Sequence, residues 1–339
     1  DDPARREAIA GHLQAVVAAT GALADLVAWA DELRRQNVVD GARATLELAI
    51  ACGHAADVHQ QAFLSVHPAH AMRDDEAYKA LVDGDRALIT DPGEAELAPL
   101  AIALAETAAL VWPDLDDILA RNAAAGARRI PASRHTPVTS MFPRVATALG
   151  AGAVVLYEHD GPDAITICAA TPVIVLGARM LSAETRTDEV RAILVRAVEL
   201  TRPEHAAVTG LPAGDAVRLL TSVIRLFGPA ALRDAVNALV DDADVQRGHD
   251  DMVRAALPVK LRTRFEQLLA PLSVATLDLA RYRTAAEHGA DRAALLLGGD
   301  ARAIVALAAA RGDSPAHLIA ALAQPGWLAL RARLGLAAR

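Results

Sequence analysis

Apolar residues recur every three to four positions over most of the chain, which predicts a protein built mainly from helices. In the first third, this spacing predicts helices over residues 5–18, 23–36, 42–51, 75–88 and 95–111. Turn-forming residues interrupt the pattern, most clearly at Thr90-Asp91-Pro92-Gly93. From Thr187 onward the spacing is again helical, with breaks at prolines and glycines.

Between these helical regions the pattern changes to short apolar runs that are typical of β-strands. Runs at 153–158 and 164–169 flank Asp160-Gly161-Pro162-Asp163, which has the composition of a hairpin turn. A third run at 172–176 ends at Gly177. A small antiparallel sheet among many helices predicts an α+β fold that is predominantly α-helical.

The segment 122–137 is rich in Gly, Pro, Ser and basic residues, and it is the expected linker. It divides the chain into a helical domain at 1–125 and an α+β domain at 126–339. With 339 residues, the chain is long enough for two domains that each have a core.

One helical hairpin in the first domain has a spacing that resembles a tetratricopeptide repeat, in which small residues let two antiparallel helices approach closely. The positions that would fill the groove between its helices are Leu26, Trp29, Ala30, Leu33, Ala42, Leu46 and Ala49. The resemblance covers about 34 residues without a second clear copy, so a generic helical hairpin remains the alternative. A single repeat is expected to stack on later helices or on repeats outside this sequence.

Composition narrows the possible classes of protein. A content of 53% hydrophobic and 22% charged residues excludes a disordered chain, and 3% aromatic residues favour packed helices over a β-sandwich. The net charge of −8 argues against a nucleic-acid partner.

Localisation is inferred from the same composition. The two cysteines, Cys52 and Cys168, favour a reducing compartment. No run is apolar enough to span a membrane and no signal peptide is visible, so we expect a cytoplasmic protein. The sequence starts without Met, and any targeting information upstream of Asp1 would not be seen.

Two segments carry the candidate chemistry. Residues 172–202 give a strand, a tight turn and an amphipathic helix that is predicted to run from Thr187 to Arg202, where Pro203 ends it. Residues 287–292 read EHGADR. Together the segments resemble the HtpX-like and CAAX-prenyl-protease-type zinc metallopeptidases, over roughly residues 141–310. In that family an edge strand aligns the substrate, the next helix carries HExxH, and a later ExxAD motif brings a third ligand.

The match to the family is uneven. Glu287-His288-Gly289-Ala290-Asp291 fits ExxAD in full, whereas the HExxH position reads Val198-Glu199-Leu200-Thr201-Arg202. HExxH works because two histidines on one helical face hold zinc while the glutamate activates a bound water. Valine offers no ligand atom, arginine is a fixed cation, and one remaining carboxylate cannot hold catalytic zinc.

The resemblance therefore implies a pseudoenzyme without catalytic residues, metal or cofactor. Its vestigial site would comprise Val198, Glu199, Arg202, Glu287 and Asp291. A helical repeat followed by such a degenerate domain is also similar to the tails of large myxobacterial repeat proteins, which implies a bacterial source.

A buried Glu287 would need a positive partner in place of the lost metal. We expect Arg202 to contact Glu287, with Glu199 nearby. The alternative is that Arg202 turns to solvent and pairs with Glu199 three residues before it.

Histidines offer a further possible metal site, in one group near the first helices and one beside the vestigial site. Because no matched cysteines or carboxylates accompany them, hydrogen-bonded or solvated histidines are the simpler interpretation. The residues concerned are His54, His59, His67, His70, His205 and His288.

The function expected from these observations is a non-catalytic interaction module that binds a protein partner through a helical groove or the former substrate cleft. The alternatives are a metal-dependent peptidase with a non-standard site and a purely structural part of a longer chain.

Overall fold

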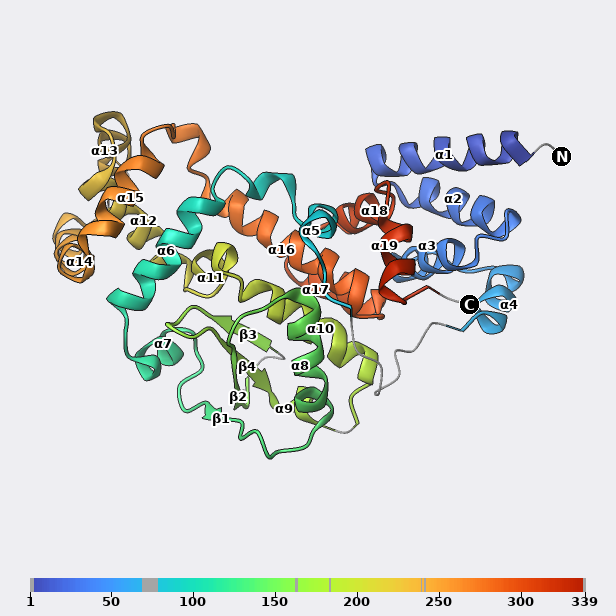
Figure 1. The fold of residues 1–339 in the computed structure, drawn as a ribbon, viewed down its shortest axis with the longest axis horizontal. Helices are drawn as coiled ribbons and strands as arrows, with labels where there is room; N and C mark the ends of the chain where they lie inside the picture. Colours follow the sequence, from blue (N-terminus) through green and yellow to red (C-terminus); the bar gives the residue numbers. More distant parts are fainter. Residues whose placement is uncertain are drawn as a thin grey trace.

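The computed structural model describes residues 3–68, 79–161, 164–182, 184–238, 240 and 242–337. It is mostly helical, at 68%, with one small four-stranded sheet, which confirms the predicted α+β class (Figure 1). The first helices are α1 (Pro3–Thr20), α2 (Leu23–Arg35), α3 (Val39–Ala51), α4 (Val58–Val66), α5 (Asp83–Ile89), α6 (Ala98–Val111) and α7 (Leu115–Arg121), with a 3-10 turn η1 (Pro92–Glu94) between α5 and α6.

The central part of the chain contains the sheet and the helix that follows it. Its elements are β1 (Arg128–Arg129), α8 (Pro137–Leu149), β2 (Val155–His159), β3 (Ala164–Ile167), β4 (Val173–Gly177), α9 (Ala178–Leu181) and α10 (Thr187–Leu200). The remaining elements are α11 (Pro203–Thr209), α12 (Ala213–Phe227), α13 (Ala230–Asn237), α14 (Ala243–Ala256), α15 (Val259–Leu269), η2 (Val274–Thr276), α16 (Leu279–Leu297), α17 (Ala301–Ala310), α18 (Ala316–Leu322) and α19 (Trp327–Leu334).

The sheet is mixed, so the prediction of an antiparallel sheet was wrong. Its strand order is β1-β2-β4-β3, with β4 parallel to β2 and antiparallel to β3. The expected hairpin between β2 and β3 does not form because β4 lies between them. All five residues of β4 are buried, and a strand that is apolar on both faces is most stable in the middle of a sheet. Pro162 and Asp163 of the predicted turn lie outside the described residues.

Side chains of β4 divide the interior into two apolar clusters. Ile174 and Leu176 belong to one cluster, with α1–α3, α8, α10 and α16–α19. Val173 and Val175 point to the other face, into a cluster with α6, α7 and α11–α16. Both clusters combine residues from before and after position 125, and the division into two domains there stays a prediction.

Helix α10 is the central helix of the fold. It packs against α16, α8, α17 and β3, which together cover it on several sides. The apolar residues that recur every three to four positions in this amphipathic helix are buried, and the helix is buried on its other sides as well. These apolar residues are Val190, Ile193, Leu194, Ala197 and Val198.

The hairpin α2–α3 lies beside the last helices of the chain, and all seven of its predicted groove residues are buried. In Figure 1 the blue helices α1–α3 lie next to the red helices α18 and α19. Asp40 accepts hydrogen bonds from both Nε and Nη2 of Arg331, each at 3.0 Å. The expected stacking on later helices is therefore observed, between helices at opposite ends of the sequence.

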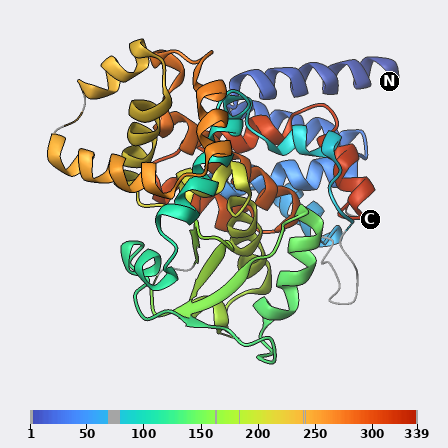
Figure 2. The same ribbon diagram turned by 60° about the vertical axis from the view of Figure 1, so that its left-hand side comes forward.

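Helices α12–α15 form a lobe on the side of the molecule away from α1 (Figure 2). Within the described part of the chain, no single helix has both the length and the apolar character needed to cross a membrane. Helices α6 and α7 meet such a criterion only as a pair, and they are bent by 115° where they join.

Candidate functional site

The two segments that resemble a metallopeptidase are adjacent in the structure, because α10 packs along α16. The contact between them is made by Arg196, two positions before Val198. Its Nε donates to Asp291 at 2.8 Å, and its Nη2 donates to Glu287. Arg196 was not among the residues predicted from the sequence. Its spacing of three residues from Glu199 and four from Ala192 does place all three on the same side of the helix.

Helix α10 ends at Leu200, two residues earlier than predicted. Arg202 has extended backbone angles (φ −61°, ψ 145°) and precedes α11, since the residue before Pro203 is excluded from helical geometry. Positions 198 and 202 therefore do not lie one turn apart on a single helix. Val198 is fully buried among apolar side chains.

The predicted contact between Arg202 and Glu287 was wrong. Arg202 lies beyond the helix end, where its Nε is 3.5 Å from Glu199 and donates to Glu204 at 2.6 Å. The local alternative is observed in part: Arg202 is near Glu199, but its side chain is only 24% exposed and its shorter contacts are to Glu204. Glu287 is instead surrounded by Arg196, Arg283 and Arg311.

Asp291 is the most deeply buried carboxylate of the site, with 0% exposure. Besides Arg196, it accepts hydrogen bonds from Arg311 and, at 3.2 Å, from His317. Burial alone would raise the pKa of Asp291, but the hydrogen bond from His317 and the charges of Arg196 and Arg311 outweigh it and lower the pKa. The carboxylate is therefore held in its ionised form.

Glu199, at the position of the catalytic glutamate in HExxH, is 3% exposed. Arg86 of α5 donates to both of its carboxylate oxygens, at 3.1 and 3.4 Å. Burial raises the pKa of Glu199 in spite of the opposing charges of Arg86, Arg202 and His205. The sequence offered no signal for Arg86, because it lies 113 positions from Glu199.

A second buried pair, His205 with Glu94, lies next to Glu199. The His205 Nε2 atom is 2.7 Å from a Glu94 oxygen, and Nδ1 is 3.1 Å from the Glu199 carbonyl oxygen. Both neighbours accept hydrogen bonds, which favours an imidazolium that donates from both nitrogens. A Cβ on Gly289 of α16 would lie 2.7 Å from Glu94 Oε1, so this glycine permits the close approach.

We expect the His205–Glu94 pair to make stability depend on pH. Burial lowers the pKa of His205, but the hydrogen bond and charge of Glu94 outweigh it, and the folded-state pKa is raised above about 6.5. The stabilisation is fully present below that unfolded value and is lost as pH rises through the folded pKa, at about 1.4 kcal/mol per unit of difference. Urea unfolding between pH 6 and 9 should show this decline in the wild type and a flatter profile in His205→Gln.

The matched control is His12→Gln, because His12 is exposed on α1. Its profile should follow the wild type. Equal profiles for wild type and His205→Gln would contradict the assignment.

Of the other candidate histidines, His59 is exposed on α4, and three have local partners. His54 is 2.9 Å from the Gln60 side chain, and the ring of His67 packs against Phe63. His288 stacks on His317 with ring centroids 3.9 Å apart, and burial together with His317 lowers the pKa of His288. His70 lies outside the described residues. Among the residues that the structure describes, no group of three or more His, Cys, Asp or Glu side chains is arranged to hold a metal ion.

The site is thus a network of ion pairs between α5, η1, α10, α11, α16, the end of α17 and the start of α18. No protein-family model, curated protein or solved structure matches this chain. The likeness to zinc metallopeptidases rests on residues 172–202 and 287–292.

Proposed function

We propose that this chain is a non-catalytic interaction module, in which a helical-repeat-like region is joined to a pseudopeptidase-like domain that binds a protein partner. The observation that supports this proposal is that an arginine pairs with each carboxylate to which the resemblance would assign a role in zinc binding or catalysis. Arg196 lies between Glu287 and Asp291, and Arg86 lies against Glu199.

These arginines oppose metalloprotease chemistry in two ways. A guanidinium is always charged and would repel a divalent cation at the same carboxylates. A general base must also be within reach of the water that it deprotonates. Both oxygens of Glu199 accept from Arg86, and the side chain is buried.

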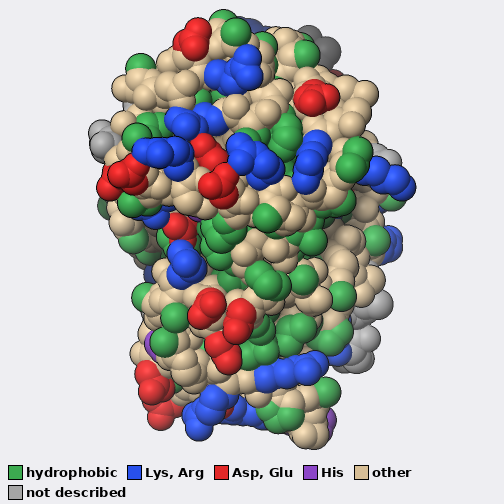
Figure 3. All heavy atoms as spheres, turned by 90° about the vertical axis from the view of Figure 1, so that its left-hand side faces the viewer, with side chains coloured by type: hydrophobic (Ala, Val, Ile, Leu, Met, Phe, Trp, Pro, Cys, Tyr) green, Lys and Arg blue, Asp and Glu red, His purple; other side chains and the backbone are tan. Residues whose placement is uncertain are grey.

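A partner-binding role agrees with the surface of the α12–α15 lobe. Four of the eleven exposed large apolar side chains among the described residues lie on these helices, namely Val217, Val245, Met252 and Val259. Figure 3 shows this end of the molecule, where apolar side chains lie among charged ones. Apolar side chains exposed on this lobe are candidates for contact with a protein partner.

Purified protein is expected to contain far less than one zinc per chain and to show no peptidase activity that a chelator removes. The double variant Val198→His/Arg202→His introduces both histidines of HExxH and should still not bind zinc. Since α10 ends at Leu200, the two histidines would not lie one turn apart on a helix, and Arg196 would still be paired with Glu287 and Asp291. Elemental analysis and a peptide-cleavage assay with and without chelator measure both effects.

Stoichiometric zinc with chelator-sensitive cleavage by the wild type would overturn the non-catalytic assignment. The partner is sought by cross-linking in cells followed by reconstitution of the purified pair. A defined complex supports the interaction role, and a chain that remains without any reconstituted partner argues for a purely structural one.

A further inference from the structure

The exposed face of α14, in the lobe α12–α15, carries a row of apolar and small side chains. Val245, Gly248, Met252 and Ala255 are all exposed, and their spacing of three and four residues places them on one side of the helix. Figure 1 shows α14 at the outer end of the lobe, at the far left of the view. A row with this spacing is typical of the seam between two packed helices, and the described part of the chain leaves it uncovered.

Gly248, in the middle of this row, makes no contact that an alanine would disturb. A Cβ at this position would meet no atom of the described residues within 4 Å, and a glycine inside a helix costs about 1 kcal/mol relative to alanine. The glycine does give a second helix room to approach, since the distance between packed helices depends on the side chains at their contact. It therefore points to a helix that docks from outside the chain.

Charged side chains border the apolar row along one edge. They form two pairs within the helix, Arg247 with Asp244 and Arg254 with Asp251. Between 56% and 85% of each side chain is exposed, so these pairs contribute little to the stability of the single chain. All four charges are accessible to a partner.

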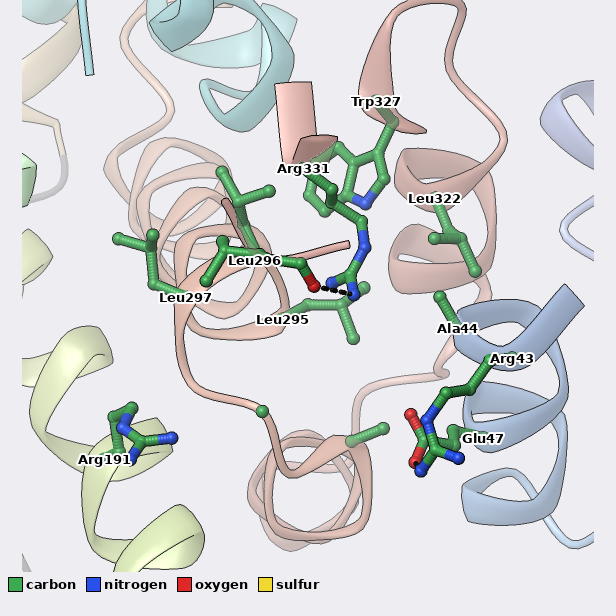
Figure 4. A pocket seen from close by; sticks show the side chains of 13 residues that line it. Arg43, Ala44, Glu47, Arg191, Leu295, Leu296, Leu297, Leu322, Trp327 and Arg331 are labelled. Atoms are coloured by element: carbon green, nitrogen blue, oxygen red, sulfur yellow. Dashed lines mark hydrogen bonds and ion pairs between the residues drawn. The ribbon is translucent and has the colours of Figure 1, made fainter. Parts of the chain in front are cut away.

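The ion pairs around the cavity between α3, α10 and the last helices are different, because they are enclosed. Arg43 pairs with Glu47 at the wall of this cavity (Figure 4), and Arg331 pairs with Asp40. The side chains of the two arginines are only 10% and 17% exposed. Their charges are balanced inside the chain, whereas those on α14 can be reached by a second molecule.

The order of the charges on α14 fits a second copy of the helix that runs in the opposite direction. Twofold symmetry turns the charged edge of one helix toward the same edge of the other and reverses its order. With the axis at the middle of the helix, Arg247 is level with Asp251 of the partner subunit, and Asp244 is level with the partner's Arg254. Opposite charges therefore face each other along the whole edge.

The uncharged row fits the same arrangement. Val245 is level with Met252 of the partner subunit, and Gly248 faces the partner's Gly248 close to the axis. A parallel pair would instead bring the charged edge of one helix against the other edge of its partner, which carries His249 and Ala256. Charge complementarity thus favours the antiparallel pair.

We propose that this face of α14 docks on the same face of a second copy of the chain and forms an antiparallel homodimer. A helix of 14 residues is about 21 Å long, and a contact of that length buries less than about 1,200 Å², which is typical of weak, reversible association. The dimer deepens the proposed interaction role, because it names one partner for the lobe. Its test requires only the pure chain, so its failure is distinct from a failure of the proposed function.

Sedimentation equilibrium of the full chain tests the dimer. We expect a monomer–dimer equilibrium with a dissociation constant on the order of 100 µM, weakened by salt. Asp244→Lys and Arg254→Glu each place like charges opposite one another, so each variant alone should associate about tenfold more weakly. An equimolar mixture of the two variants brings opposite charges together again and should restore the dimer.

Gly248→Ala should stabilise the helix of the monomer and weaken the dimer several-fold, a combination that loss of folding cannot produce. Arg5→Glu is the matched control, because it reverses an exposed charge on α1, away from the lobe (Figure 2). It should sediment like the wild type. A chain that stays monomeric at about 500 µM, five times the expected dissociation constant, would overturn the proposal and leave this face to a different protein. Failure of the mixture to restore the dimer, or an equal loss in Arg5→Glu, would also overturn it.

Discussion

Replacing Asp291 with alanine is expected to lower the free energy of unfolding by about 3–5 kcal/mol. Asp291 is fully buried and contacts Arg196, Arg311 and His317. Removing the carboxylate leaves Arg196 and Arg311 with only one of the two carboxylates that they share, Glu287. Breaking a buried ion pair on one side costs far more than the intact pair contributes, because the remaining charge stays desolvated. Equilibrium urea unfolding at pH 7, followed by far-ultraviolet circular dichroism, measures the change.

Asp251→Ala is the matched control, since Asp251 pairs with Arg254 on the surface of α14 with 73% of its side chain exposed. Its loss should cost less than about 1 kcal/mol.

The lowered pKa of Asp291 adds a second criterion. Its stabilisation is present above the unfolded pKa of about 3.9 and is lost as pH falls through the lower folded pKa. The difference between wild type and Asp291→Ala should therefore shrink in strong acid, and two variants of equal stability at pH 7 would refute the role assigned to the ion pairs.

Gly298→Ala is expected to destabilise the protein by about 1–3 kcal/mol through overpacking. A Cβ at Gly298, just after α16, would lie 2.7 Å from the Cα atom of Ala192 and 2.5 Å from the carbonyl oxygen of Ala294. Both are backbone atoms; the Ala192 Cα cannot move without shifting α10 against α16, and the Ala294 oxygen cannot move without distorting the end of α16. The φ angle of Gly298 is −78°, which any residue adopts, and the effect is therefore steric. Thermal and urea unfolding measure it.

Gly248→Ala provides the control with the opposite sign. A Cβ at Gly248, inside α14, would meet no atom within 4 Å. Alanine has the higher helix propensity, so this variant should gain up to about 1 kcal/mol. The same sign of effect at both positions would show that the close approach of α10 and α16 does not explain the glycine at 298.

Periodicity predicted most of the helices because their apolar faces are also the faces that are buried. The helix predicted at 75–88 was wrong over residues 79–82, since α5 begins at Asp83, and the short helices α4 and α7 were missed. The seven groove residues of α2–α3 and the predicted face of α10 illustrate this agreement. The sheet order was missed because a hairpin was expected between neighbouring strands in sequence. The run 173–177 did contain the necessary information, since it is apolar at every position and therefore suited to the centre of a sheet.

The candidate site was predictable only in its coarse arrangement. The two segments lie together, as the resemblance implied, and arginine does lie against the buried carboxylates. Which arginine contacts which carboxylate could not be predicted from the spacing of residues in the sequence. Pro203 was visible in the sequence, and its effect on Arg202 moves that side chain away from Glu287. Arg86 and Arg311 reach the site from other helices, through contacts that no local pattern encodes.

The packing of α1–α3 against α18 and α19 has a consequence for synthesis on the ribosome. Asp40 and its partner Arg331 are 291 positions apart. At about 5–20 residues per second, Arg331 is made roughly a quarter of a minute to a minute after Asp40. During that interval the apolar face of the early helices, with Leu26 and Trp29, lacks the partner that covers it in the folded protein. The nascent chain must therefore keep this face from aggregating, through transient contacts of its own or through a chaperone, until the last helices emerge.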